Sequence, residues 1–133
     1  MIGVKVKTVD NFKRVERAAD KAAFTSFAHA AASIAKDARS TIEKAPEGVP
    51  SAPGTPPHTH RGRYLSRAIK FAADKEGAVI GPMASIVGEE LGPTHEFGQE
   101  REGVDFDERP FMGPALERAI PRFGGEWRGS IGE

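Results

Sequence analysis

The chain has 133 residues, with 19 basic and 19 acidic side chains, and so carries no formal net charge at pH 7. This length suits one domain with one modest core, and the neutral balance disfavours a protein that coats DNA along its whole surface. The absence of cysteine excludes disulfides, thiolate metal sites and cysteine nucleophiles, and it suits a reducing cytosol. We expect neither a membrane span nor an N-terminal secretory signal.

The N-terminal third predicts a short strand followed by a long helix. Residues 2–9 alternate apolar and polar side chains, which predicts a half-buried strand, and Asp10 or Asn11 is expected to cap the following helix. From Phe12 to about Lys44 the chain lacks proline and glycine, and apolar residues recur every three to five positions. A helix over this range would be about 50 Å long.

This predicted helix is longer than a domain of this size normally buries. Alanine allows helices to approach closely, so we infer that part of its alanine-rich stripe packs on a neighbouring subunit. The alternative is a helix that breaks near Thr25 and Ser26 and folds on itself. The stripe consists of Ala18, Ala22, Ala23, Ala28, Ala30, Ala31 and Ala32.

Residues 45–62 contain five prolines and three glycines, which exclude a helix or a central strand. They predict an extended arm or a long loop, and an arm could reach along an adjacent subunit. After a helical turn at 63–66, residues 68–73 and 78–82 predict a β-hairpin whose turn, residues 74–77, ends in glycine.

The remaining chain predicts short elements and a second helix. Residues 86–97 indicate a strand end and then a short helix, interrupted at Gly92-Pro93, and residues 98–108 predict an acidic surface loop. Pro114 suits the first position of a helix that Pro121 kinks or restarts. The expected fold is a single α+β domain over residues 1–133. In it, a long N-terminal and a C-terminal helix pack on an antiparallel sheet of three to four strands.

The sequence offers only weak evidence for catalytic groups. His58, His60 and His95 are metal-ligating residue types, but an H-x-H on a proline-rich loop favours exposed histidines over a zinc site. His29 lies among alanines, and this setting favours a histidine that is packed or lies at an interface. The carboxylates of residues 89–108 favour a solvated acidic surface. Nucleophile, Walker A and Rossmann motifs are absent, so we expect no enzyme and no cofactor or metal.

A basic segment follows the proline-rich region. It carries one tyrosine and could contact phosphate or line a DNA channel, although we favour a solvated or intersubunit face. Its cations are Arg61, Arg63, Arg67 and Lys70.

Four motifs then occur in a particular order over about residues 53–121. They are PGTPPHTHRGRYLSRAIKF, AVIGP, THEFGQ and RPFMGPALERAI. Together they resemble the gp-ten-like family of bacteriophage tail-completion and neck proteins, which includes the minor tail protein Z group of lambda-like phages. The chain departs from the family pattern at Arg61 and Gln99, where threonine is usual, and at Tyr64, which is an added residue.

The resemblance implies a virion protein of the head–tail junction that forms a ring, typically a hexamer, around the DNA channel. Its partners would be other copies of itself, neighbouring neck, connector and tail-tube proteins, and the genomic DNA that passes through. It would be made in the host bacterial cytoplasm. The alternatives are a nucleic-acid-binding phage accessory protein and, more distantly, a metal-dependent hydrolase that uses the three histidines named above.

The motif residues are expected to be structural. Phe97 and Phe111 would anchor the core, Gly98 would permit a tight backbone, and Arg109 would pair with Glu96. The complete set carried by the resemblance is Gly62, Leu65, Gly81, Pro82, Glu96, Phe97, Gly98, Arg109, Pro110, Phe111, Pro114 and Ala115.

Overall fold

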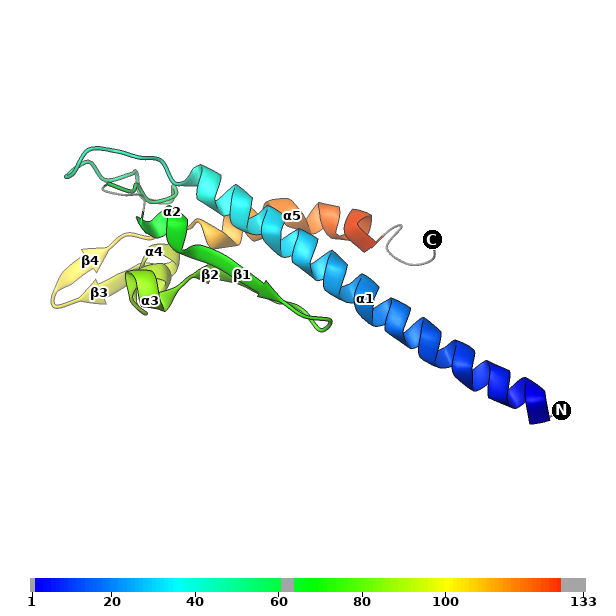
Figure 1. Cartoon of the computed structure of the whole chain (residues 1–133). Coiled ribbons are helices and arrows are strands. Elements are labelled where there is room, and N and C mark those ends of the chain that lie inside the picture. Colours follow the sequence, from blue (N-terminus) through cyan, green and yellow to red (C-terminus); the bar gives the residue numbers. More distant parts are fainter. Residues whose placement is uncertain (1, 61–63, 128–133) are drawn as a thin grey trace.

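The computed structural model describes residues 2–60 and 64–127, with side chains over 12–60 and 64–122. One long helix forms the axis of the molecule, and the other elements gather around its C-terminal half (Figure 1). The elements confirm the α+β class. In chain order they are α1 (Ile2–Thr41), α2 (Tyr64–Ala68), β1 (Ile69–Ala73), β2 (Ala78–Pro82), α3 (Ala84–Val87), α4 (Leu91–Phe97), β3 (Gln99–Arg101), β4 (Val104–Phe106) and α5 (Met112–Trp127).

Helix α1 is continuous over 40 residues, which corresponds to about 60 Å. It passes through Thr25 and Ser26 without a break, so the alternative of a folded-back helix is wrong. The predicted strand at residues 2–9 is also wrong, because these residues form the first turns of α1, and Asp10 and Asn11 lie inside the helix. A strand needs a partner for its backbone groups, whereas a helix satisfies them locally, and none of the described strands pairs with this segment.

The hydrophobic core lies between the C-terminal half of α1 and α5. Ala35 and Ala38 of α1 and Ala115 and Ala119 of α5 are buried in one cluster, and such small side chains let two helices approach closely. Larger members complete the cluster: Ile34, Ile42, Leu65, Ile69 and Phe111.

The alanine-rich stripe of α1 is covered partly by its own chain. Ala22 and Ala31 are buried within the subunit, so they do not belong to the part of the stripe that would pack on a neighbouring subunit. Ala18 is exposed, and the other members are half-buried.

The predicted hairpin is confirmed as the antiparallel pair β1–β2, with Phe71 opposite Ile80. Asp74 organises its turn by accepting hydrogen bonds from the backbone N–H groups of Glu76 and Gly77, at 2.7 and 3.0 Å. Residues 98–108 contain a second hairpin, β3–β4, where a loop was predicted. The four strands therefore form two separate two-stranded ladders rather than one sheet.

Three prolines lie inside helices. Pro93 is in the first turn of α4, so Gly92-Pro93 begins that helix instead of interrupting it. Pro114 is the third residue of α5 rather than the first, a position whose N–H needs no intrahelical partner. Pro121 lies within α5, which continues through it to Trp127.

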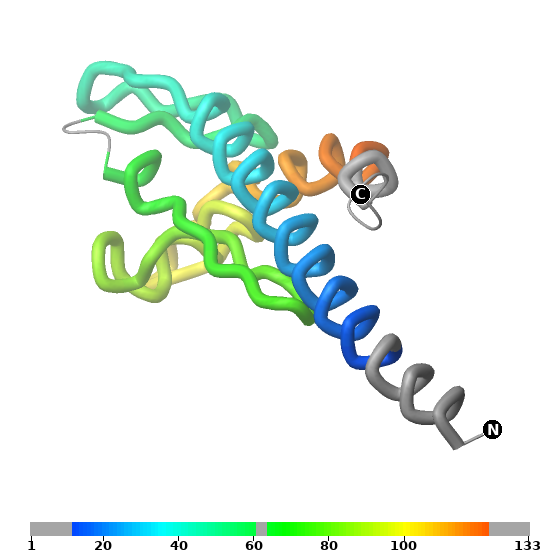
Figure 2. Tube along the Cα trace, turned by 45° about the vertical axis from the view of Figure 1, so that its right-hand side comes forward, coloured from blue at the N-terminus to red at the C-terminus, as the bar shows by residue number. Residues whose placement is uncertain are grey.

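The described part of the proline-rich segment is a loop that returns to its starting point. Thr59 receives a hydrogen bond from the Ala45 N–H at 3.0 Å and donates its own N–H to the Glu43 carbonyl at 2.8 Å. Ser51, Pro57 and Thr59 are buried against their own chain. Figure 2 shows this loop doubling back beside the C-terminal end of α1. Of the two predicted forms, the described residues adopt the long loop.

Candidate functional site

Two of the four sequence motifs meet at the start of α5. The carboxylate of Glu96, on α4, accepts hydrogen bonds from the backbone N–H groups of Phe111, Met112 and Gly113 at 3.0, 3.0 and 2.6 Å. These N–H groups precede the first intrahelical hydrogen bonds, and the helix dipole favours a negative charge there. Glu96 therefore fixes the position at which α5 begins relative to α4.

Arg109 does not pair with Glu96, and that prediction is wrong. Its Nε donates to the Ser51 carbonyl at 3.1 Å, and its guanidinium also contacts Asp107, whose carboxylate lies 3.8 Å away. The backbone N–H of Arg109 donates to the His95 carbonyl at 2.5 Å. Because the carboxylate of Glu96 is occupied by the start of α5, Arg109 instead ties the proline-rich loop to this junction.

The two motif phenylalanines have opposite environments. Phe111 is fully buried, which confirms its predicted place in the core, whereas Phe97 is 77% exposed and does not anchor it. The short helix α4 buries Gly92 instead, where an added Cβ would lie 2.8 Å from Cγ of Pro82. Gly98 has a φ of +69°, and a Cβ there would lie 2.8 Å from the Phe106 carbonyl oxygen, which confirms the tight backbone.

The remaining motif residues are mainly structural. Gly81 lies in β2 with open space where a Cβ would project, so the structure gives no steric reason for glycine there. Pro82 packs against Gly92, as described above, and Gly62 lies outside the described residues. Four further motif positions are buried or half-buried: Leu65, Pro110, Pro114 and Ala115.

The basic segment can be placed only in part. Arg67, at the end of α2, and Lys70, in β1, are both exposed and lie three residues apart. Arg61 and Arg63 lie outside the described residues. A DNA-contacting or intersubunit role for these four cations therefore stays a prediction.

Three histidines border a common groove of about 410 Å³ between the proline-rich loop, α2 and α4. Nδ1 of His58 lies 2.9 Å from the Val49 carbonyl, and Nδ1 of His60 lies 3.1 Å from the Ala45 carbonyl. Burial, reinforced by the positive charge of Arg109, lowers the pKa of His95 below its ordinary 6.5. Over the side chains that the structure describes, no three metal-ligating residues converge on a point that could hold an ion.

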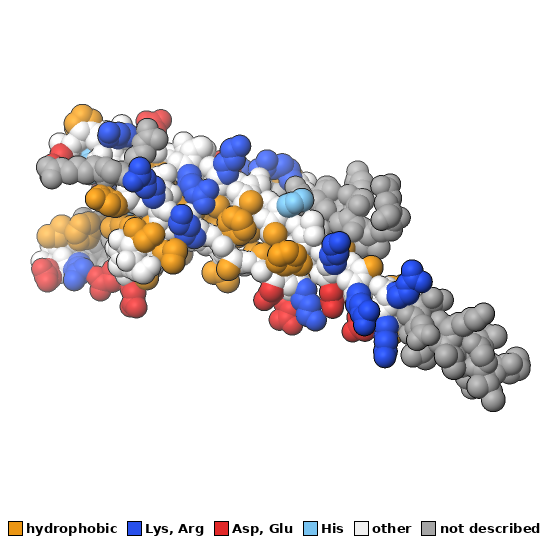
Figure 3. Space-filling view, in the orientation of Figure 1, with side chains coloured by type: hydrophobic (Ala, Val, Ile, Leu, Met, Phe, Trp, Pro, Cys, Tyr) orange, Lys and Arg blue, Asp and Glu red, His pale blue; other side chains and the backbone are white. Residues whose placement is uncertain are grey.

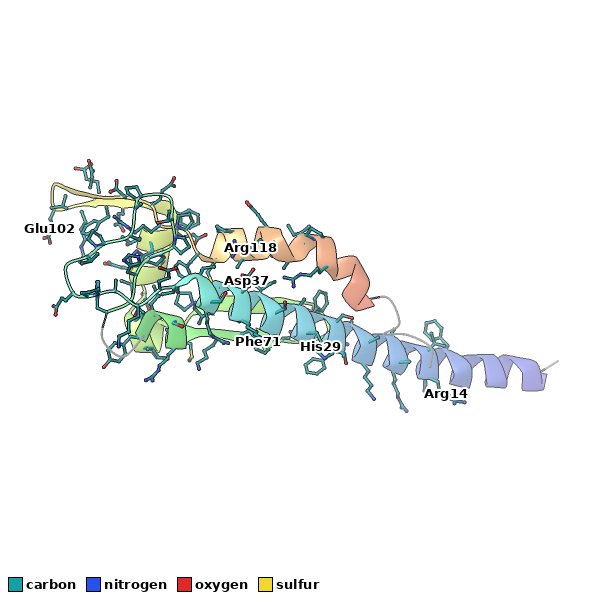
Figure 4. The ribbon with its side chains drawn as sticks, turned by 90° about the horizontal axis from the view of Figure 1, so that it is seen from above. Arg14, His29, Asp37, Phe71, Glu102 and Arg118 are labelled. Atoms are coloured by element: carbon teal, nitrogen blue, oxygen red, sulfur yellow. The ribbon has the colours of Figure 1, made fainter. Side chains whose placement is uncertain are left out.

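Sequence reasoning missed the polar contacts that fasten α1 to the other elements. Arg39 donates from Nε and Nη2 to the Ile69 carbonyl at 3.1 and 2.7 Å. Asp37 accepts from Nε of Arg118 at 2.8 Å, and Figure 4 shows this pair between α1 and α5. These partners are 30 and 81 residues apart in the sequence, and no local pattern signals such pairings.

Sequence reasoning also missed how much apolar surface the described chain leaves uncovered. Two residues of α5, Leu116 and Ile120, are exposed and share one side of the helix, because they are four positions apart. Val79 on the outer side of the β1–β2 hairpin is 78% exposed. Figure 3 shows apolar side chains lying open on one face of the molecule. The other large exposed apolar residues are Phe12, Val15, Phe24, Val49, Tyr64, Phe71, Met83, Ile86, Phe97, Val104 and Phe106.

In comparisons with known proteins, no family model, no curated protein and no solved structure matches the chain. Among the helices in the described residues, none combines the length and apolar character required to cross a bilayer. The resemblance to phage neck proteins therefore rests on the four sequence motifs.

Proposed function

We propose that this chain is a structural, non-catalytic subunit of the head–tail junction, or neck, of a long-tailed bacteriophage. Copies of it close into a ring around the DNA channel, and this ring completes or terminates the tail and joins it to the head. By analogy with the family that the chain resembles, the ring is a hexamer. The order and spacing of the four motifs support this assignment. The motifs meet in structural contacts, with Glu96 at the start of α5 and Phe111 in the core.

The observation that carries the proposal is the amount of surface that one copy leaves open. Large apolar side chains of the described residues are exposed on α1, on α5 and on the outer side of the first hairpin. Large exposed apolar surface marks contact with other molecules, and repeated copies of one chain supply such contacts in a ring.

The anchored half of the molecule suits a subunit that assembles as a rigid body. α1 is fastened to β1 through Arg39 and to α5 through Asp37 and Arg118. α5 is in turn positioned by Glu96. A rigid body with open apolar faces can repeat around an axis without refolding, because the contacts between copies need not replace contacts within a copy.

The location of the protein in virus particles tests this function. In the phage that encodes the chain, disrupting its gene should give separate heads and tails, and supplying the intact chain from a plasmid should restore joined particles. Antibody labelling should place the protein at the junction in purified particles. Infectious, normally joined particles in the absence of the chain would refute the neck assignment.

A further inference from the structure

Two segments of this neutral chain carry opposite net charges. Residues 2–21 contain six basic and three acidic side chains, whereas residues 87–108 contain eight acidic side chains and one arginine. Figure 1 places the start of α1 and the β3–β4 hairpin at opposite ends. In Figure 3, acidic side chains gather at the β3–β4 end and in a second group beneath the middle of α1, and basic side chains follow α1.

The basic end also carries unpartnered apolar side chains. Phe12 is 68% exposed and Val15 is 66% exposed, and their spacing of three residues puts them on the same side of α1. Lys13, Arg14 and Arg17 are exposed around them, as is every residue of α1 from 12 to 18. This part of α1 is therefore an amphipathic helix segment that the described residues leave uncovered.

The acidic end contains a groove of about 480 Å³ between α3–α4 and the β3–β4 hairpin. Val87, Leu91 and Phe106 give it apolar walls, and Glu89 and Glu90 lie along it. Its one cation, Arg101, is paired with Glu90, so the carboxylate of Glu89 determines the sign of the rim. A volume of this size falls within the range of about 300–1,000 Å³ typical of natural binding pockets.

We propose that the N-terminal end of α1 from one copy of this chain docks in the β3–β4 groove of the next copy. Phe12 and Val15 would pack on the apolar walls, and Lys13 and Arg14 would face Glu89. A second copy is the occupant because it supplies the complementary charge and the apolar side chains together. One molecule cannot bring its two opposite ends together.

This docking rests on the proposed function and specifies the contact that would close the ring. Each copy offers one helix end and one groove, so the contact is heterologous and can be repeated from copy to copy. The exposed charges would mainly set orientation and association rate, and the apolar contact would supply most of the affinity.

Cross-linking of single-cysteine variants tests the contact directly, because the natural chain has no cysteine. Val15→Cys and Val87→Cys are purified separately, mixed and treated with a short bis-maleimide. We expect a covalent dimer in the mixture and at least tenfold less in either variant alone. Val15→Cys mixed with Val79→Cys is the matched control, because Val79 is exposed but lies on the β1–β2 hairpin.

The outcomes separate this inference from the proposed function. A dimer formed equally well with the Val79→Cys control, or no dimer while the unmodified chain still forms rings, overturns the docking and leaves the neck function standing. If the cross-linked dimer is specific but the chain assembles only into pairs and never into a ring, the docking is supported and the ring is refuted.

A charge exchange provides a second, independent test. One variant carries Lys13→Glu and Arg14→Glu, and the other carries Glu89→Lys and Glu90→Lys. Each alone should assemble at least tenfold less tightly than the natural chain, because its end and its groove repel. Mixed together they should recover assembly, since acidic ends meet basic grooves. Unimpaired assembly of the single variants would overturn the docking. The docking would also be overturned if the unmodified helix end bound duplex DNA in a salt-dependent way and this binding left assembly unaffected.

Discussion

The two halves of α1 form one continuous helix and have opposite surroundings. Both lack proline and, beyond Gly3, glycine, yet Ala31, Ala35 and Ala38 are buried while residues 12–18 are exposed. The difference comes from the rest of the chain, because α5 and β1 cover the C-terminal half. A helix can be specified locally over its whole length, but which part is buried depends on the length of the elements that pack on it.

The polar contacts follow the same division. Arg39 and Asp37 hold the C-terminal half of α1 to β1 and α5. Toward the N-terminus, Asp20 pairs with Lys75 of the hairpin turn at 3.4 Å, with about half of each side chain exposed, and exposed pairs of this kind contribute little stability. We therefore expect substitutions in the C-terminal half to change folding and those in the N-terminal half to change association.

Phe111→Ala should have the largest effect, because it removes the largest fully buried side chain of the core that covers the C-terminal half of α1. We expect a loss of about 3–5 kcal/mol in the free energy of unfolding, measured by urea denaturation. Phe97→Ala is the matched control and should change stability little. A Phe111→Ala protein with an unchanged transition would mean that this core does not anchor α1.

Glu96→Ala should have the next largest effect, since it leaves three N–H groups at the start of α5 without their charged acceptor. Hydrogen bonds to charged groups contribute about 1.5–3 kcal/mol, and a loss of that order is expected in the same denaturation experiment. Glu100→Ala, in exposed β3, is the control. Equal effects from the two substitutions would rule out the capping role of Glu96.

Ala35→Leu compared with Ala18→Leu sharpens the contrast between the two halves. Leucine and alanine both favour helix, so the difference reports packing. Ala35 is fully buried, and overpacking there should cost about 1–3 kcal/mol, whereas Ala18 is exposed and should tolerate leucine. Thermal unfolding of both variants measures this difference, and similar losses at the two positions would contradict the division of α1.

The smallest expected effect is a pH dependence that originates at His95. Because its pKa is lowered in the folded protein by burial and by Arg109, the unfolded chain binds a proton there at a higher pH than the folded chain does. Its contribution to stability is therefore complete above the ordinary pKa of 6.5 and falls as the pH drops below that value. Urea unfolding between about pH 7.5 and pH 5 should show the loss, and His95→Gln should reduce it. An unchanged pH profile in His95→Gln would assign the dependence to other groups.

Local pattern was sufficient to predict much of the fold. The uninterrupted stretch from Phe12 predicted the long helix, and Gly77 between two apolar runs predicted the β1–β2 hairpin. The strand expected at residues 2–9 failed because alternation over eight residues does not supply a partner strand. The β3–β4 hairpin was missed because its six residues are exposed and only Val104 and Phe106 among them are apolar, which is too short a pattern to indicate a strand.

The sequence predicted the residues of the candidate site better than it predicted the contacts between them. The motifs identified Glu96, Arg109 and Phe111 as structural, and the structure places them together. The actual partner of Glu96 was not predictable, because the start of α5 competes for its carboxylate and three backbone donors prevail over one guanidinium. The groove at β3–β4 was also missed, since its walls come from α3, α4 and β4.

The molar mass of the unmodified chain in solution tests the central claim, that its open surface closes on copies of itself. Light scattering behind size exclusion, over a wide range of concentration, should give a species near six copies of the 14.3 kDa chain. Removing residues 1–18 should abolish that species while leaving the unfolding transition in place. A monomer at every concentration, with or without those residues, would contradict the account.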